Sequence, residues 1–415
     1  MKAKITEKEK NYLRDLAKRQ QEIAALPIMK ERENLWYAHN SLQGDRPVIV
    51  MEEDTFLPCI LPERVCETPL AREMETALQK TIKSYELIDD DKVVPDYYTV
   101  YDAVSLRPHN LELKKIYASD GLGFHIEPVF DNLEEGLPLM EDSVFLYDRE
   151  KTAEMAESAQ EIFGDILPIR RKNQINHWEM GITQRIVNLM GMENMYCSMM
   201  EEPDAFHQFM ERITDDMIRL LRWEEDKGLL YLNHENDYMG SGSFCFTKEL
   251  PGPGYDGKVK SRDTWGHLNS QESIGVSPDM FREFIYPSYE RLAQEFGLLY
   301  YGCCEPVDRY WESCLSRIPN LRKISISPWC NEEYMGERLR EGQVIYSRKP
   351  SPNYLGVRAE FDKDAFEKHI RQTLLSAKGC KLEFIFRDIY DLHGNLEKLK
   401  QAVQMTRNLS EEFYR

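Results

Sequence analysis

The feature that most constrains the fold is a regular alternation of predicted helices and short apolar strands that begins near Thr152. The helices are amphipathic, and one starts at Ser277 and Pro278, which suit an N-cap and the first helical position. The predicted strands are residues 228–232, 298–301, 321–327, 344–347 and 382–386. Strands that alternate with helices pair in parallel, because each helix returns the chain to the same end of the sheet. The sequence therefore predicts an α/β fold.

Polar residues follow each of these strands at its carboxyl end. In chain order they are Asn233 to Asp237, Cys303 to Glu305, Trp329 and Cys330, Arg348 and Lys349, and Arg387 and Asp388. An open, doubly wound sheet would also alternate, but no glycine-rich dinucleotide or phosphate-binding motif follows a strand. We therefore expect a (β/α)8 (TIM) barrel whose strand-end residues converge on one cavity at the carboxyl-terminal face.

The chain before this region has a different pattern. Residues 5–40 read as a charged amphipathic helix interrupted at Pro27, residues 46–51 as a strand and residues 68–88 as a second helix. We expect two units: an N-terminal extension, 1–90, that packs on the barrel, and the barrel itself, 91–415. The first helix is interpreted as a solvated surface helix, with the arm of a homodimer as the alternative.

Charge and hydropathy exclude several classes of function. The formal net charge of -19 argues against binding to nucleic acid or to an anionic membrane surface. No apolar run is long enough to cross a membrane, and the amino terminus lacks the apolar core of a signal peptide. Nine cysteines without regular spacing favour reduced thiols over a disulfide framework. These features predict a cytoplasmic protein.

Two adjacent thiols and a carboxylate, Cys303, Cys304 and Glu305, follow the predicted strand 298–301. Thiolate and carboxylate form a ligand set suited to zinc, so these three residues are the candidate metal ligands. The alternative is that both cysteines are small buried residues of the core.

Three further strand-end residues carry groups that can exchange protons or bind a metal. His234, Asp237 and Asp388 are therefore the candidate catalytic residues. His234 and Asp237 are also alternative ligands for the metal, although a lone histidine at a strand end more often makes a hydrogen bond or contacts substrate.

The run from Ser277 to Pro287, followed by Tyr301-Gly302-Cys303-Cys304, resembles the uroporphyrinogen decarboxylase superfamily over roughly residues 150–405. True decarboxylases of that family carry an early arginine-rich loop that holds the porphyrinogen carboxylates, and nothing like it precedes the alternating region here. The better match is the branch that resembles corrinoid-dependent methyltransferases. Residues 240–251, which begin Gly-Ser-Gly-Ser-Phe, are similar to a subgroup of that branch.

This resemblance implies a zinc-dependent methyltransferase. Such an enzyme moves a methyl group from a small donor, such as a methoxylated aromatic or a methylamine, to cobalamin carried by a partner corrinoid protein. Cys303 falls on the family's zinc cysteine, whereas Tyr301 occupies the place of the histidine two residues earlier. A late cysteine ligand is also missing, because the last strand ends at Arg387-Asp388.

Four residues are expected to bind substrate. They are Tyr301, Trp329, Arg348 and His177. Aromatic side chains among them suit a methoxylated ring or a quaternary ammonium group. Two other classes of function stay open from the sequence: a decarboxylase related to the family's founding enzyme, and a barrel that binds a ligand without catalysis.

Overall fold

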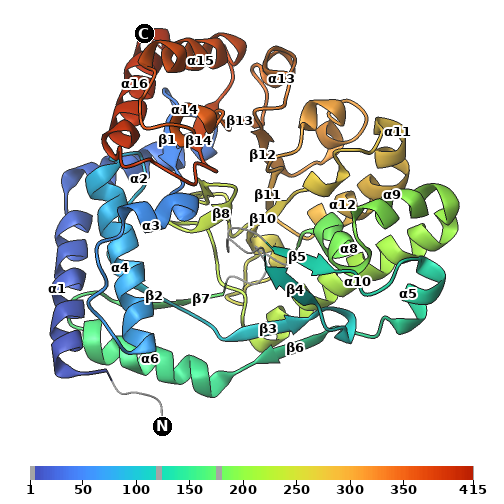
Figure 1. Cartoon of the computed structure of the whole chain (residues 1–415), viewed down its shortest axis with the longest axis horizontal. Helices are drawn as coiled ribbons and strands as arrows, with labels where there is room; N and C mark the ends of the chain where they lie inside the picture. Colours follow the sequence, from blue (N-terminus) through green and yellow to red (C-terminus); the bar gives the residue numbers. More distant parts are fainter. Residues whose placement is uncertain (1–4, 118–123, 174–179, 415) are drawn as a thin grey trace.

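The centre of the structure is a sheet of six parallel strands. In this computed structural model, which describes residues 5–117, 124–173 and 180–414, the strand order is β1-β14-β13-β12-β11-β10. The strands are β1 (Val48–Met51), β10 (Trp265–Leu268), β11 (Leu298–Tyr301), β12 (Leu321–Ile326), β13 (Ile345–Arg348) and β14 (Leu382–Phe386). The parallel α/β arrangement predicted from the alternation is confirmed, and the strands curve around the middle of the molecule (Figure 1).

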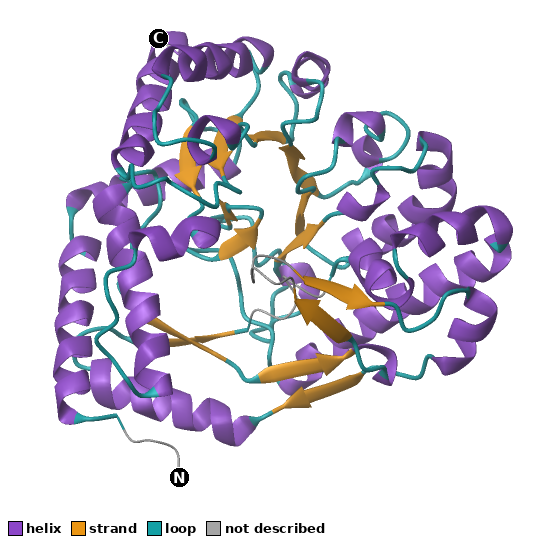
Figure 2. Cartoon of the chain, viewed as in Figure 1, coloured by secondary structure: helices purple, strands orange, loops and turns teal. Residues whose placement is uncertain are grey.

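Helices pack against this sheet and enclose the largest hydrophobic core. In chain order these are α8 (Ile182–Met190), α9 (Met192–Glu201), α10 (Pro203–Lys227), α12 (Tyr286–Ala293), α13 (Glu332–Leu339), α14 (Asn353–Gly356), α15 (Lys363–Ser376) and α16 (Glu397–Tyr414). Figure 2 shows them on the outside of the strands. The predicted N-cap at Ser277 is confirmed, since its side chain accepts a hydrogen bond from the Met280 amide.

The helix predicted from Ser277 is present but is not continuous. It consists of α11 (Pro278–Met280), a π-helical turn (Phe281–Ile285) and α12, which starts one residue before Pro287. Proline has no amide hydrogen and crowds the preceding turn, so it interrupts the regular ladder at this point.

The N-terminal segment supplies both helices and a strand of the central sheet. Its helices are α1 (Glu7–Ala24), α2 (Pro27–Asn40), α3 (Leu57–Ile60) and α4 (Pro69–Leu87). The break at Pro27 and the helix that follows Thr68 are confirmed. Because β1 pairs with β14, residues 48–51 belong to the central sheet, and the division of the chain at residue 90 stays a prediction.

Shorter strands form two-stranded pairs outside the central six-stranded sheet. β2 (Tyr98–Tyr101) and β7 (Ile169–Lys172) form a parallel pair, next to α6 (Arg149–Phe163). Three antiparallel pairs are β3 (Val104–Arg107) with β6 (Val144–Tyr147), β4 (Lys114–Tyr117) with β5 (Phe124–Glu127), and β8 (Tyr238–Gly240) with β9 (Ser243–Phe244). A further α-helix of the described residues is α5 (Leu133–Leu139). A second core joins α1, α4 and α6 to the β2–β7 pair.

The described strands do not close into a barrel, because side chains occupy the edges of the six-stranded sheet. At β1, the Ile49 and Met51 amides donate to the carboxylates of Asp91 and Asp90 at 2.9 and 2.8 Å. At β10, the Asn233 side chain bonds both the amide and the carbonyl of Trp265, at 2.8 and 3.0 Å.

The predicted strand at residues 228–232 is therefore absent from the ladder. Those residues are not assigned as strand, and a side chain replaces the main-chain pairing there. In the described part of the chain, no helix has the length and apolar character needed to cross a membrane.

Candidate active site

Cys303 lies in a tight bend directly after β11, and the bend depends on Gly302. Gly302 has φ 98°, and a Cβ added there would lie 3.0 Å from Ser325 Cβ. The Cys303 backbone is fixed on both sides, because its amide donates to Glu305 Oε2 at 2.9 Å and its carbonyl accepts from Ser325 Oγ at 2.8 Å. The bend thus sets the position of the Cys303 sulfur.

Two groups stabilise a negative charge on that sulfur. Cys303 Sγ is 3.6 Å from Cys304 Sγ and 3.3 Å from Arg387 Nη1. Against the opposing effect of burial, the Cys304 hydrogen bond and the Arg387 charge lower the pKa of Cys303 to about 6. The same pairing raises the pKa of Cys304, which stays a neutral thiol and donor. Both neighbours therefore favour the thiolate form of Cys303.

Arg387, the residue after β14, is held in place by three oxygen-bearing side chains. Its Nη1 donates to Ser241 Oγ at 2.8 Å, and its Nε lies 3.1 Å from Glu52 Oε2 and 3.4 Å from Asp388 Oδ2. Tyr238 donates a hydrogen bond to Glu52 from the same side. Sequence reasoning placed Arg387 at a strand end but did not select it as a site residue.

The turn between β8 and β9 brings Ser241 to the site. Ser241 has φ 50°, which is uncommon for a residue with a side chain, and Gly242 has φ 84°. A Cβ at Gly242 would lie 2.2 Å from Ile385 Cγ2, so only glycine lets the turn approach β14 this closely. The Gly-Ser-Gly-Ser sequence thus has a structural reason: it places two hydroxyl groups over the sheet.

The buried amine of Lys349 and the hydroxyl groups of Ser347 and Tyr300 lie near Cys303. Lys349 Nζ donates to Ser347 Oγ at 2.8 Å and also bonds the Tyr300 hydroxyl. Burial lowers the pKa of the Lys349 ammonium to about 7. A group with this pKa can give or take a proton at neutral pH.

A second buried cluster crosses the sheet interior. Lys323 Nζ lies 2.9 Å from Glu383 Oε2 and 2.7 Å from Ser243 Oγ, and His39 Nε2 lies 3.2 Å from the same carboxylate oxygen. Burial alone would raise the pKa of Glu383, but Lys323 and His39 lower it well below its usual range. The cluster ties α2 and the β8–β9 turn to β12 and β14.

Glu305 stabilises the bend through backbone hydrogen bonds. Its two carboxylate oxygens accept from the Ser270 and Cys303 amides at 2.8 and 2.9 Å. Burial, with a contribution from the Cys303 charge, raises the pKa of Glu305 to about 7.

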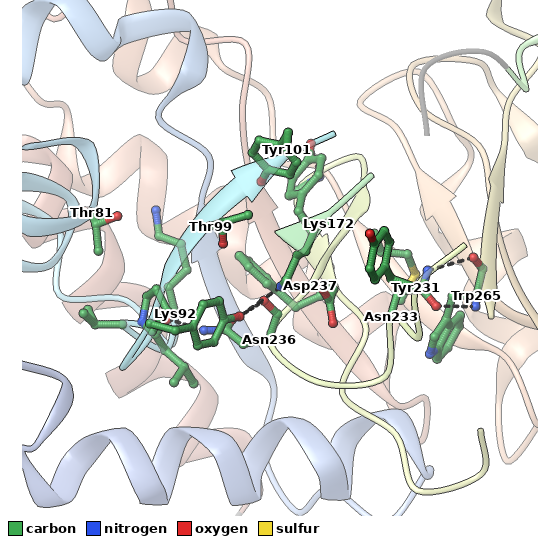
Figure 3. Close-up of a pocket in the computed structure, with 18 of the residues that line it drawn as sticks. Thr81, Lys92, Thr99, Tyr101, Lys172, Tyr231, Asn233, Asn236, Asp237 and Trp265 are labelled. Carbon is green, nitrogen blue, oxygen red and sulfur yellow. Dashed lines mark hydrogen bonds and ion pairs between the residues drawn. The ribbon is translucent and has the colours of Figure 1, made fainter. Parts of the chain in front are cut away.

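A cavity of about 680 Å³ lies between β1, the β2–β7 pair, residues 229–233 and β10. Figure 3 shows side chains from these segments, with Lys172 and Asp237 joined at 2.5 Å and Asn233 bonded to Trp265. Glu52 and Tyr238 also line the cavity, whereas Cys303 does not. The Glu52–Arg387 ion pair therefore stands between this cavity and the thiolate.

A smaller cavity, of about 340 Å³, lies beside Cys304. Its lining is Met192, Gln271, Glu272, Ile274, Cys304, Glu305 and Trp329. Trp329 is 72% exposed, so its ring offers a flat apolar surface at the mouth.

The predicted strand-end residues do not share one cavity, so that prediction is wrong. Asp237 lines the larger cavity, whereas Cys304, Glu305 and Trp329 line the smaller one. Asp388 lies beside Arg387 and lines neither. Asn233 and Trp265, where a side chain replaces the main-chain pairing, both line the larger cavity.

Arg348 and Tyr301 point away from both cavities. Arg348 is 1% exposed and bonds the Ile326 and Ser327 carbonyls and the Glu332 carboxylate. Tyr301 is buried, and its hydroxyl lies 2.5 Å from Ser270 Oγ. Both side chains are engaged in the core and are not available to substrate.

The remaining predicted residues are histidines. His234 lines neither cavity; its carbonyl accepts from the Thr247 amide, and its Nδ1 is buried without a hydrogen-bond partner among the described residues. His177 falls outside the residues that the structure describes.

The residues present do not fit a zinc ion as they are arranged. Within residues 5–117, 124–173 and 180–414, no three His, Cys, Asp or Glu side chains gather as a metal site. Both oxygens of Glu305 accept backbone hydrogen bonds, and the Arg387 cation lies against Cys303. Zinc stays a prediction from the resemblance, and no chemical step is assigned to it below.

No protein-family model matches this sequence, and no curated protein matches it. Among solved structures, a methyltransferase from Methanosarcina mazei is similar, with a TM-score of 0.48 and 12% sequence identity. The alignment covers 92% of this chain and 99% of that chain. We therefore infer function from the residues of the site.

Proposed function

We propose that this chain is a methyltransferase in which Cys303 is the reactive group. The observation that carries the proposal is the position of Cys303 Sγ, 3.3 Å from Arg387 Nη1 and beside the neutral Cys304 thiol. The thiolate is the nucleophilic form of cysteine, and a methyl carbon bound to a leaving heteroatom is a substrate for it.

In the proposed step, Cys303 Sγ attacks the methyl carbon of a small donor. The new S–C bond forms as the bond from carbon to the donor's heteroatom breaks, and the heteroatom leaves with that electron pair. It takes up a proton, for which the Cys304 thiol, on the smaller cavity, is available. The Trp329 ring would hold a methoxylated aromatic or methylamine donor at the mouth of that cavity.

The resemblance in the sequence supports the cobalt of a partner corrinoid protein as the final methyl acceptor. It also supports the interpretation of the fold as a (β/α)8 barrel whose wall is open. We propose that β2, β7 and residues 229–233 continue the wall of a barrel related to the (β/α)8 type, opened at the two edges of the central sheet that side chains occupy.

The test uses protein purified without oxygen or chelator and donors with deuterated methyl groups. Methoxylated aromatics and methylamines are supplied with cob(I)alamin, and the label is sought on the tryptic peptide 292–309 and on cobalt. We expect Cys303→Ser to lose both labels and Cys59→Ser, at an exposed cysteine, to keep both. Full transfer by Cys303→Ser would refute the proposal.

The same preparations distinguish the other classes of function. Stoichiometric zinc that is lost in a Cys303→Ser, Cys304→Ser double variant would support the metal set expected from the resemblance. Turnover of a porphyrinogen would support a decarboxylase. Ligand binding without turnover of any donor would support a binding protein.

A further inference from the structure

Cys303 and Cys304 are adjacent in sequence, and their sulfur atoms are 3.6 Å apart. All nine cysteines are free thiols. Other buried cysteines have different partners: Cys330 Sγ lies 3.5 Å from Ser327 Oγ, and Cys380 Sγ donates to the Gly336 carbonyl at 3.3 Å. Cys304 is thus the thiol placed to react with an oxidised Cys303.

We propose that this pair is a modification site, which a hydroperoxide converts reversibly into a disulfide between adjacent residues. Cys303 sulfur attacks one peroxide oxygen, the O–O bond breaks, and a sulfenic acid and water form. Cys304 sulfur then attacks the sulfenic sulfur, the S–S bond forms, and a second water leaves. Two thiols lose two electrons, and one hydrogen peroxide is reduced to two waters.

The surroundings supply access and charge. Cys304 lines the smaller cavity, so peroxide can reach the pair from solvent. Arg387 Nη1, 3.3 Å from Cys303 Sγ, stabilises the attacking thiolate. The two sulfurs must approach from 3.6 Å to a disulfide length of about 2.05 Å, and because Glu305 and Ser325 hold the Cys303 backbone, we assign this movement to Cys304.

The backbone also explains why the modification is reversible. Adjacent Cα atoms are about 3.8 Å apart, whereas most disulfides join Cα atoms roughly 4.4–6.8 Å apart. The bond between neighbours is therefore strained, and strained disulfides are the ones that thiols reduce readily. The inference depends on the positions of the sulfurs and not on the methyl donor, so it can fail or succeed independently of the proposed function.

The test treats the full chain, reduced and free of reductant, with one equivalent of hydrogen peroxide. The tryptic peptide 292–309 contains Cys303 and Cys304 and no other cysteine. We expect this peptide to lose the mass of two hydrogen atoms and to regain it with dithiothreitol. Added oxygen atoms in place of that loss, or no change while Cys59 is oxidised, would overturn the proposal.

Variants separate the two thiols. Cys304→Ser removes the resolving thiol, so dimedone should trap a sulfenic acid at Cys303, and longer exposure should add two oxygen atoms that dithiothreitol cannot remove. Cys59→Ser is the matched control and should form the disulfide at the wild-type rate. A Cys304→Ser protein that resists peroxide as the reduced thiol would overturn the assignment of Cys303 as the attacking sulfur.

Discussion

Arg387, at the end of β14, places its Nη1 3.3 Å from the sulfur of Cys303, at the end of β11. Two strands, β13 and β12, lie between β14 and β11 in the sheet. The contact is therefore made across the hollow of a strongly curved sheet, and it joins a permanent cation to the thiol. Four expected outcomes follow from this site and its supports.

The first concerns the pH dependence of thiol reactivity. With a pKa of about 6, Cys303 gains its thiolate as pH rises from 5 to 7 and is fully ionised above that range. The rate of iodoacetamide labelling, followed on the peptide 292–309, should rise over this range and then level off. A labelling rate that keeps rising to pH 9 would show that the pKa of Cys303 is that of an ordinary cysteine.

The second concerns Arg387. Replacing it by glutamine removes the cation from Cys303, which should raise the thiol pKa by about 1–2 units and slow labelling at pH 6 roughly 5- to 50-fold. Arg358→Gln, at an exposed position, removes a charge elsewhere and should leave the labelling rate unchanged. Equal labelling rates in the two variants would show that Arg387 does not stabilise the Cys303 thiolate.

The third concerns the buried Glu383. Glu383→Gln leaves the Lys323 charge without its carboxylate, so the free energy of unfolding should fall by about 3–5 kcal/mol. A Lys323→Met, Glu383→Leu double variant removes both charges and should lose less. Urea unfolding measures the free energy of unfolding of the single and the double variant. A double variant that is less stable than Glu383→Gln would contradict the view that the unpaired Lys323 charge causes the loss.

The Glu383 carboxylate also makes the stability of the protein depend on pH in the acid range. Because the pKa of Glu383 is lowered in the folded state, the unfolded chain binds more protons as pH falls. The contribution to stability is therefore present above about pH 4.3, the ordinary glutamate value, and is lost as pH falls below it.

The fourth concerns Gly242. Alanine at this position meets both an unfavourable φ of 84° and Ile385 Cγ2 at 2.2 Å, whereas Gly254 has φ 89° with open space around it. Backbone strain alone should cost each alanine variant about 1–3 kcal/mol. Thermal unfolding should show a larger loss for Gly242→Ala, and that variant should also slow Cys303 labelling because Ser241 moves away from Arg387. Equal losses of stability in the Gly242→Ala and Gly254→Ala variants would show that the β8–β9 turn does not approach Ile385 of β14 closely.

Much of the fold could be predicted from local chemistry. A cap and a proline, Ser277 and Pro27, mark helix ends because they act within one turn. Apolar runs likewise predicted β11 to β14. The two open edges of the sheet could not be predicted. They depend on the side chains of Asp90, Asp91 and Asn233, which bond main-chain groups of β1 and β10 that lie far from them in the sequence.

The site was predicted in part for a related reason. Strand ends identify the edge of a sheet, but strands buried on both faces give no alternation that tells which way a side chain points. Arg348 and Arg387 both end predicted strands, yet one enters the helix layer and the other meets Cys303. A signal for Arg387 did exist: it is a cation directly after a predicted strand, at the same carboxyl-terminal edge of the parallel sheet as the thiols that follow β11.

The capped edges of the central sheet have a consequence for association between molecules. An exposed strand edge offers unpaired amides and carbonyls to which a strand from another chain can add. On β1, Asp90 and Asp91 already bond the outward amides, and on β10, Asn233 occupies both groups of Trp265. Because these main-chain groups are already bonded, they are not open to a strand from another chain, and the two edges of the sheet do not become sites of strand addition and aggregation.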